Sequence, residues 1–159
     1  MADFQIAIKI VLEHEGVLVD DAKDPGGVTK YGISHKSYPH EDIPNLTVDR
    51  AKQIYEIDYW NKIRGNEIRC QRIADKLLDM SVLMGSRNAV VCLQRALYSC
   101  NAMEKLSSID GVVGDRTLYS INNNAEYVVL PTFKSECAGY FRCLNNENYI
   151  SGWLHRAYE

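Results

Sequence analysis

The sequence lacks the long apolar run that a membrane-spanning helix requires. No uninterrupted apolar stretch approaches the roughly 20 residues needed to cross a bilayer. The N-terminal stretch contains Asp3 and Lys9, and it lacks the basic start and unbroken apolar core of a signal peptide. We therefore expect a chain that is cytoplasmic when made and that does not insert stably into membranes.

A strong charge of either sign is also missing. The chain has 18 basic and 21 acidic side chains, a net charge of −3, and neither sign forms a long run. Nucleic-acid-binding domains commonly carry a basic patch or stripe. We therefore expect no nucleic acid partner.

The cysteines lack the number and spacing of a disulfide framework or a zinc knuckle. There are five, an odd number, and no two form a CxxC pair: Cys70, Cys92, Cys100, Cys137 and Cys143. We expect most of them to be buried free thiols, with no metal site and no cofactor.

Two further enzyme classes find little support. His14-Glu15 begins like the zinc-protease motif HExxH, but Leu18 stands where the second histidine is required. Cys92 and Cys100 fall within or at the end of an apolar helix, where a buried thiol is a poor nucleophile. The sequence thus favours neither a zinc peptidase nor a cysteine hydrolase.

Apolar residues recur at helical spacing along most of the chain. The pattern predicts helices over residues 4–15, 48–63, 72–84, 87–100 and 125–144, and a short helix that contains Leu118 and Ile121. Thr47 and Asp115 are placed to cap two of these helices. Pro131 lies either at the true start of the last helix or inside it, as a kink.

The segment between the first two helices is rich in glycine and proline and predicts loops with a short hairpin strand over residues 28–34. A chain of 159 residues fits one core. The predicted fold class is therefore mainly α, a single globular domain with a small β-hairpin after the first helix.

The apolar face of the first helix ends on a carboxylate. The apolar positions are Phe4, Ile8, Val11 and Leu12. Glu15 is next in the series, and Gly16 follows as a helix stop. Apolar neighbours and the C-terminal end of a helix both favour the protonated carboxyl, as a general acid requires.

Asp24, in the Gly-rich turn over residues 24–27, is a candidate second carboxylate, and glycoside hydrolysis commonly uses such a pair. A glutamate near a helix end also commonly forms a salt bridge, and an aspartate before Pro-Gly-Gly commonly caps its own turn. The spacing of Glu15 and Asp24 leaves these interpretations open.

A series of short motifs follows in a specific order. They are His14-Glu15-Gly16, Asp24-Pro25-Gly26-Gly27-Val28-Thr29, Tyr31-Gly32-Ile33, Asp58-Tyr59-Trp60-Asn61, Ile63-Arg64-Gly65, Asp79-Met80-Ser81-Val82-Leu83-Met84-Gly85 and Leu93-Gln94-Arg95-Ala96-Leu97. Together they resemble glycoside hydrolase family 108. Two later segments look like the peptidoglycan-binding region that closes proteins of this family, so the resemblance covers essentially the whole chain: Asp110-Gly111-Val112-Val113-Gly114-Asp115-Arg116-Thr117-Leu118 and Gly152-Trp153-Leu154-His155-Arg156. Two positions depart from the family pattern: Val17 replaces a usual glycine, and Lys30 replaces a common asparagine.

The resemblance implies a lysozyme-like, mostly helical fold and N-acetylmuramidase activity with Glu15 as the catalytic general acid. The expected reaction is cleavage of the β-1,4 bond between N-acetylmuramic acid and N-acetylglucosamine. It also implies a catalytic region over residues 1–90 and a helical peptidoglycan-binding region over residues 91–159, packed into the same globule.

Many relatives are phage endolysins or phage-derived bacterial proteins, so the resemblance implies action on bacterial peptidoglycan after release from the cytoplasm. A holin-type pore is a plausible export route for such a protein, and we expect a monomer.

Several side chains that follow Glu15 in the sequence suit a sugar substrate. Thr29 and Ser34 offer hydroxyl groups for a sugar or a positioned water, and Tyr31 and Trp60 offer aromatic faces for sugar rings. Each also fits hairpin closure or core packing. The alternative function is a non-catalytic peptidoglycan-binding or secretion-related regulatory protein that keeps the fold without turnover.

Overall fold

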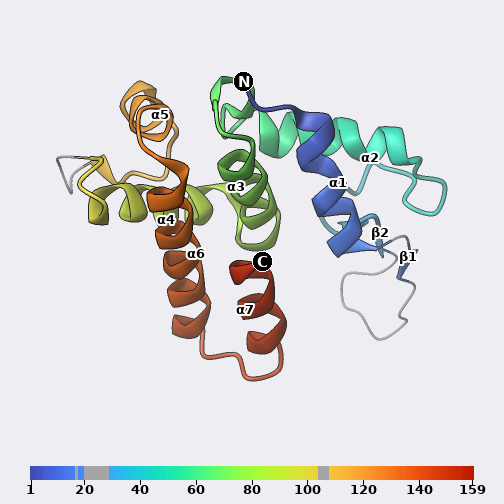
Figure 1. Cartoon of the computed structure of the whole chain (residues 1–159). Helices are drawn as coiled ribbons and strands as arrows, with labels where there is room; N and C mark the ends of the chain where they lie inside the picture. Colours follow the sequence, from blue (N-terminus) through green and yellow to red (C-terminus); the bar gives the residue numbers. More distant parts are fainter. Residues whose placement is uncertain (17, 20–28, 104–107) are drawn as a thin grey trace.

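The helices pack around α3, which lies near the middle of the molecule and contacts α1, α4 and α6 (Figure 1). The structure is a computed structural model that describes residues 1–16, 18–19, 29–103 and 108–159. Its α-helices are α1 (Phe4–Glu15), α2 (Val48–Tyr55), α3 (Gln71–Met84), α4 (Ser86–Ser99), α5 (Asp115–Asn122), α6 (Glu126–Cys143) and α7 (Ile150–Tyr158). The predicted mainly helical architecture is confirmed.

Helix α1 has a capping residue at each end. The side chain of Asp3 accepts a hydrogen bond from the Gln5 N–H at 2.7 Å. Gly16 has a φ of 71°, and its N–H donates to the Leu12 carbonyl. The helix therefore ends at Glu15, as predicted, with its apolar face packed on α3.

A small antiparallel sheet follows α1. Its strands are β1 (Leu18–Val19), β2 (Thr29–Lys30) and β3 (Ile33–Ser34), in the order β1-β2-β3. Tyr31 and Gly32 join β2 to β3 and have φ values of 53° and 74°. Positive φ at both central residues is the geometry of a tight type I′ hairpin turn. The predicted single strand over residues 28–34 is thus two short strands with a turn between them.

Helix α2 begins as predicted but changes its winding before it ends. The hydroxyl of Thr47 caps it by accepting from the Arg50 N–H at 3.2 Å. From Glu56 to Trp60 the chain forms a π-helix, η1, and a 3-10 turn, η2, spans Gly65–Glu67. The predicted continuous α-helix over 48–63 was therefore wrong beyond Tyr55. Such π-helical turns are frequent at functional sites.

Two details of the later helices also differ from expectation. Gly114 holds the cap position of α5, and Asp115 is the first residue inside the helix, where its charge still suits the helix N-terminus. Pro131 lies inside α6, which begins at Glu126. Of the two positions considered for Pro131, the one at the true start of the helix is excluded.

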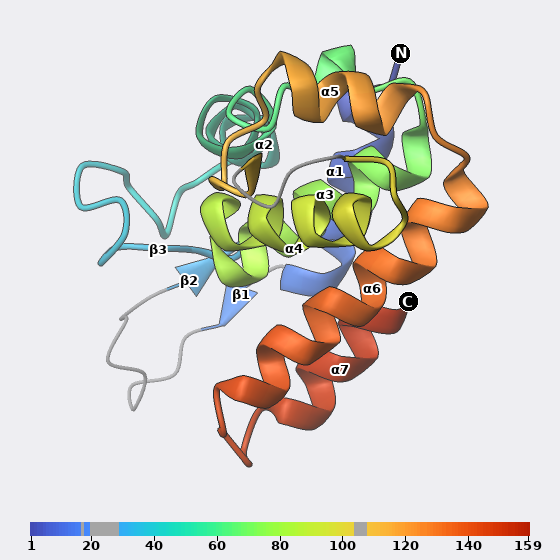
Figure 2. The same ribbon diagram turned by 90° about the vertical axis from the view of Figure 1, so that its left-hand side faces the viewer.

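Helix α7 was not predicted from the pattern. It lies beside α6 in both views and returns the chain toward α1 and α3 (Figures 1 and 2). Trp153 anchors it by stacking between Phe141 and Tyr149, with ring centroids 5.4 Å and 5.7 Å apart. This return brings the last residues of the described chain next to the end of α1.

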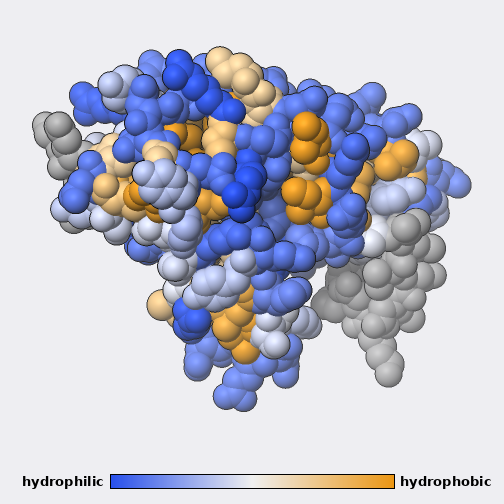
Figure 3. Space-filling model, viewed as in Figure 1, coloured by the Kyte–Doolittle hydropathy of each residue, from blue (hydrophilic) through white to orange (hydrophobic). Residues whose placement is uncertain are grey.

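The surface carries only scattered apolar side chains on the face that Figure 3 shows, where small hydrophobic patches lie among hydrophilic residues. In the described part of the chain, no helix combines the length and the apolar character that spanning a membrane requires.

Candidate active site

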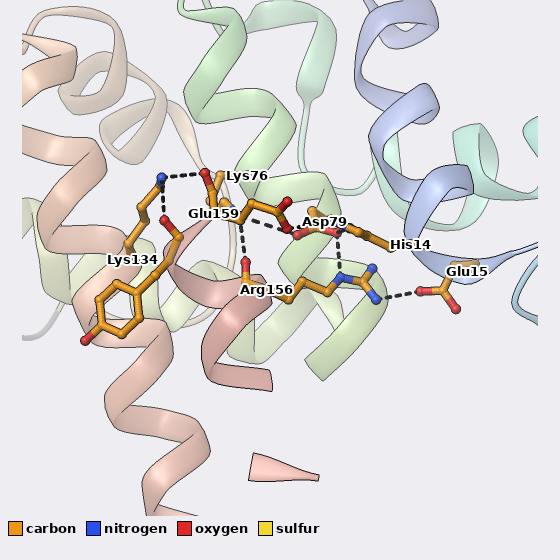
Figure 4. Close-up of polar contacts among 8 residues, drawn as sticks. His14, Glu15, Lys76, Asp79, Lys134, Arg156 and Glu159 are labelled. Atoms are coloured by element: carbon orange, nitrogen blue, oxygen red, sulfur yellow. Dashed lines mark hydrogen bonds and ion pairs between the residues drawn. The ribbon is translucent and has the colours of Figure 1, made fainter. Parts of the chain in front are cut away.

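Glu15 lies at the C-terminal end of α1 and forms an ion pair with Arg156 of α7. Its Oε1 accepts a hydrogen bond from Arg156 Nη1 at 2.8 Å, and its side chain remains 21% exposed (Figure 4). The salt bridge left open by the sequence pattern is therefore present, although Glu15 is still accessible.

Arg156 is held in turn by Asp79, a carboxylate at the centre of α3 with only 1% of its side chain exposed. Asp79 Oδ1 accepts from Arg156 Nε at 2.8 Å and lies 3.0 Å from His14 Nδ1. Lys76 Nζ lies 3.5 Å from Asp79 Oδ2 and donates to the Arg156 carbonyl at 2.8 Å. Since a buried carboxylate is costly without cations, these contacts explain why Asp79 is tolerated in the core.

The guanidinium of Arg156 is itself largely buried, with 13% of the side chain exposed. Burial alone lowers the pKa of Arg156, but the charges and hydrogen bonds of Asp79 and Glu15 outweigh it and raise that pKa above its ordinary value. Arg156 is therefore a permanent cation beside Glu15.

The hairpin turn lies beside the other oxygen of Glu15. A Cβ added to Gly32 would lie 2.6 Å from both Glu15 Oε2 and Tyr55 Oη, so only glycine fits there. Tyr55 donates from its hydroxyl to the Tyr31 carbonyl at 2.8 Å and fixes the turn against α2. Burial, followed by the charge of Glu15, raises the pKa of Tyr55, which keeps this donor protonated.

An open cavity of about 500 Å³ lies beside the π-helix η1. Its lining residues are Ser37, Tyr38, Asp58, Tyr59, Lys62 and Ser86. Tyr38 donates to Asp58 Oδ2 at 2.9 Å. Burial, and after it the charges of Asp58 and Glu15, raise the pKa of Tyr59 against a lowering hydrogen bond from Tyr38. The ring of Tyr59 also packs against that of Tyr55, with centroids 5.6 Å apart, and Tyr55 bonds the turn beside Glu15.

The segment of the chain that contains Glu15 matches a known protein family. Residues 8–85 match the family model Glycosyl hydrolase 108. This match supports the predicted resemblance and, with it, a glycoside hydrolase. Arg156 lies outside the matched segment, although it binds Glu15 inside it.

A solved structure described as "Structure of Brucella abortus SagA" is similar to this chain over nearly its whole length. The TM-score is 0.79 and the identity 26%, covering 97% of this chain and 88% of the other. The likeness confirms the predicted fold class, a mainly α, lysozyme-like domain with a small hairpin. No curated protein matches the chain.

The structure brings only part of the predicted site together. Tyr31 lies in the turn over Glu15, and Thr29 precedes it in β2, partly buried. Ser34 lies in β3, where its hydroxyl donates to the Ser37 hydroxyl at 3.2 Å and accepts from the Ser37 N–H. Asp24 lies outside the described residues.

Trp60 is a core residue. It is 0% exposed, and its Nε1 donates to Asn66 Oδ1 at 2.8 Å. A Cβ added to Gly65 would lie 2.3 Å from the indole ring, so the backbone packs directly on it. This burial leaves Trp60 no surface for a sugar ring, and packing, the other interpretation of this residue, accounts for it.

The cysteines are less buried than expected. All five cysteines are free, but only Cys92 and Cys137 are buried, so the expectation that most are buried was wrong. Among the described residues, no cluster of histidine, cysteine and carboxylate side chains is arranged to hold a metal ion.

Proposed function

We propose that this protein cleaves the glycan strands of bacterial peptidoglycan as an N-acetylmuramidase, with Glu15 as the general acid. The observation that carries the proposal is the placement of Glu15, a partly exposed carboxylate held between Arg156 and the hairpin turn. The family match at residues 8–85 supports the same class of chemistry.

The two oxygens of Glu15 have different surroundings, and this difference suits proton donation. Oε1 accepts from Arg156, whereas Oε2 lies against the exposed Gly32. A proton on Oε2 leaves the Arg156 hydrogen bond intact and faces the side of the hairpin. From there it is transferred to the oxygen that links N-acetylmuramic acid to N-acetylglucosamine as that bond breaks. A water molecule then adds its hydroxyl group to the anomeric carbon of N-acetylmuramic acid, and its remaining proton returns to Glu15.

The cavity beside η1 supplies surfaces that suit a sugar chain. Tyr59 and Tyr38 offer aromatic faces, and Asp58 offers acceptors for sugar hydroxyl groups. We propose that the glycan strand extends from Glu15 along Tyr59 into this cavity.

The test is the release of reducing ends from purified peptidoglycan by wild type, Glu15→Gln and Glu13→Gln. Glu13 is an exposed acid in the same helical turn as Glu15 and serves as the matched control. We expect Glu15→Gln to lose at least about 100-fold in rate, since general acids typically contribute 10²–10⁴-fold, and Glu13→Gln to keep wild-type activity. Binding of wild type to peptidoglycan without release of reducing ends would instead support the non-catalytic wall-binding function.

A further inference from the structure

Arg156 is far from Glu15 in the sequence but binds it in the folded protein. Its hydrogen bonds to two carboxylates hold the side chain of Glu15 in a fixed position. Nη1 bonds to Glu15 and Nε bonds to Asp79, both at 2.8 Å. Asp79 is anchored in α3, the helix around which the others pack. One rigid, planar guanidinium therefore fixes the carboxyl of Glu15 relative to the core.

The groups that face Glu15 come from several elements. Arg156 of α7 binds it directly, and Tyr55 of α2 and Tyr59 of η1 are close enough to sense its charge. Behind Arg156 lies Asp79 of α3, which contacts His14 of α1, and His14 in turn contacts Glu159. Arg156 is the cation in direct contact, and Asp79 opposes its charge from behind. The electrostatic potential at Glu15 therefore depends on both Arg156 and Asp79.

We propose that Arg156 is a positioning residue that holds Oε1 of Glu15, directs the catalytic proton to Oε2 and sets the pH at which that proton is lost. The inference rests on the proposed function for its catalytic part. It assigns Arg156, in the predicted peptidoglycan-binding region, to the site of the general acid.

Two further contacts fit this role and distinguish it from a surface ion pair. Lys76 donates to the Arg156 carbonyl, and Lys134 donates to the carbonyls of Tyr158 and Glu159, so both lysines tie the end of α7 to the helices beneath it. Arg156 Nη2 is buried and has no hydrogen-bond partner among the described residues. The guanidinium is thus held by its backbone and by two carboxylates, and it has little freedom to leave Glu15.

The test compares Arg156→Gln with Arg142→Gln. Arg142 also contacts α7, through the Tyr158 hydroxyl at 3.4 Å, but it does not bind Glu15. For Arg156→Gln we expect kcat at the optimum pH to fall about 10- to 100-fold, the range for a misplaced catalytic group. We also expect the descending limb of kcat/KM against pH to move to higher pH, because the cation that favours the carboxylate is gone. Arg142→Gln should change neither quantity.

A second readout does not require activity. The titration of the Glu15 carboxyl is followed by NMR in protein with carboxyl-labelled glutamate, and the signal is assigned by its absence in Glu15→Gln. Its midpoint should move to higher pH in Arg156→Gln and stay in place in Arg142→Gln; an unchanged midpoint in Arg156→Gln overturns the inference. If wild type releases no reducing ends but the midpoint moves, the proposed function fails while the control of Glu15 by Arg156 stands.

Arg156→Lys covers the case in which the glutamine variant does not fold. A lysine keeps the charge but lacks the planar fork that bonds both carboxylates at once. We expect the pH limb to stay near that of wild type while kcat falls about tenfold. An unchanged kcat in Arg156→Lys would contradict the positioning role.

Discussion

Glu15 and Asp79 bind the same guanidinium group, Glu15 through Nη1 of Arg156 and Asp79 through Nε, at 2.8 Å each. Glu15 is partly exposed at the end of α1, whereas Asp79 is almost completely buried in α3. Since the two carboxylates share one cation, a change of charge at Asp79 is expected to alter the behaviour of Glu15.

Asp79→Asn should move the descending limb of the pH–rate profile to lower pH, opposite to Arg156→Gln. Removing the negative charge leaves the cation of Arg156 uncompensated, and that cation then favours the carboxylate of Glu15 more strongly. The same substitution should cost on the order of 3 kcal/mol of unfolding free energy, because a buried cation loses its partner. Activity from acid to neutral pH and urea unfolding measure the two effects; a limb that moves to higher pH would refute the shared-cation account.

Gly32→Ala should reduce both stability and activity. Gly32 has a φ of 74°, and an added Cβ would lie 2.6 Å from Glu15 Oε2. The strain of the left-handed conformation is on the order of 1–2 kcal/mol, and the contact also displaces the acid.

Gly139→Ala is the matched control for this substitution. Gly139 lies inside α6 with open space around its Cβ position, so alanine there should stabilise the protein by roughly 0.5–1 kcal/mol. Thermal melts and initial rates of both variants test the pair, and equal activity of Gly32→Ala and wild type would show that the turn does not position Glu15.

Asp75→Asn should raise the melting temperature at neutral pH. Burial raises the pKa of Asp75 above its ordinary value, against a lowering hydrogen bond from Gln71. A carboxyl with a raised folded-state pKa contributes stability at low pH and loses it as the pH rises through that value. The advantage of Asp75→Asn should therefore shrink as the pH falls through the titration of Asp75. Melting curves at several pH values check this, and an advantage that grows toward low pH would contradict it.

Asp58→Asn should weaken substrate binding and leave the chemical step largely intact. Asp58 lines the cavity beside η1 and accepts from Tyr38 at 2.9 Å. Loss of one hydrogen-bonded acceptor worth about 1 kcal/mol corresponds to a roughly fivefold rise in KM. Glu56→Gln, in the same π-helix but outside the cavity lining, is the control. A fall in kcat at unchanged KM would instead place Asp58 in the chemical step.

Local sequence signals predicted much of the fold and the position of Glu15. The apolar face of α1 and the stop at Gly16 located Glu15 at the helix end, and Thr47 correctly marked the start of α2. These features depend on residues close in sequence, which is why periodicity and capping rules detect them.

Arg156, the partner of Glu15, is brought to it by tertiary packing, which periodicity and capping rules cannot predict. Arg156 is separated from Glu15 by nearly the whole chain, and α7, which carries it, was not predicted. One signal was present: Asp79 lies among apolar residues in the helix predicted over 72–84, and a buried carboxylate requires a cation. The π-helix at Asp58 and the burial of Trp60 likewise follow from packing that no local pattern records.

The most direct test of the central claim is mass spectrometry of the fragments that wild type and Glu15→Gln release from purified peptidoglycan, after borohydride reduction of their ends. The account predicts that wild-type fragments end in reduced N-acetylmuramic acid and that a folded Glu15→Gln variant releases none. Fragments that end in reduced N-acetylglucosamine, or equal release by Glu15→Gln, would contradict it.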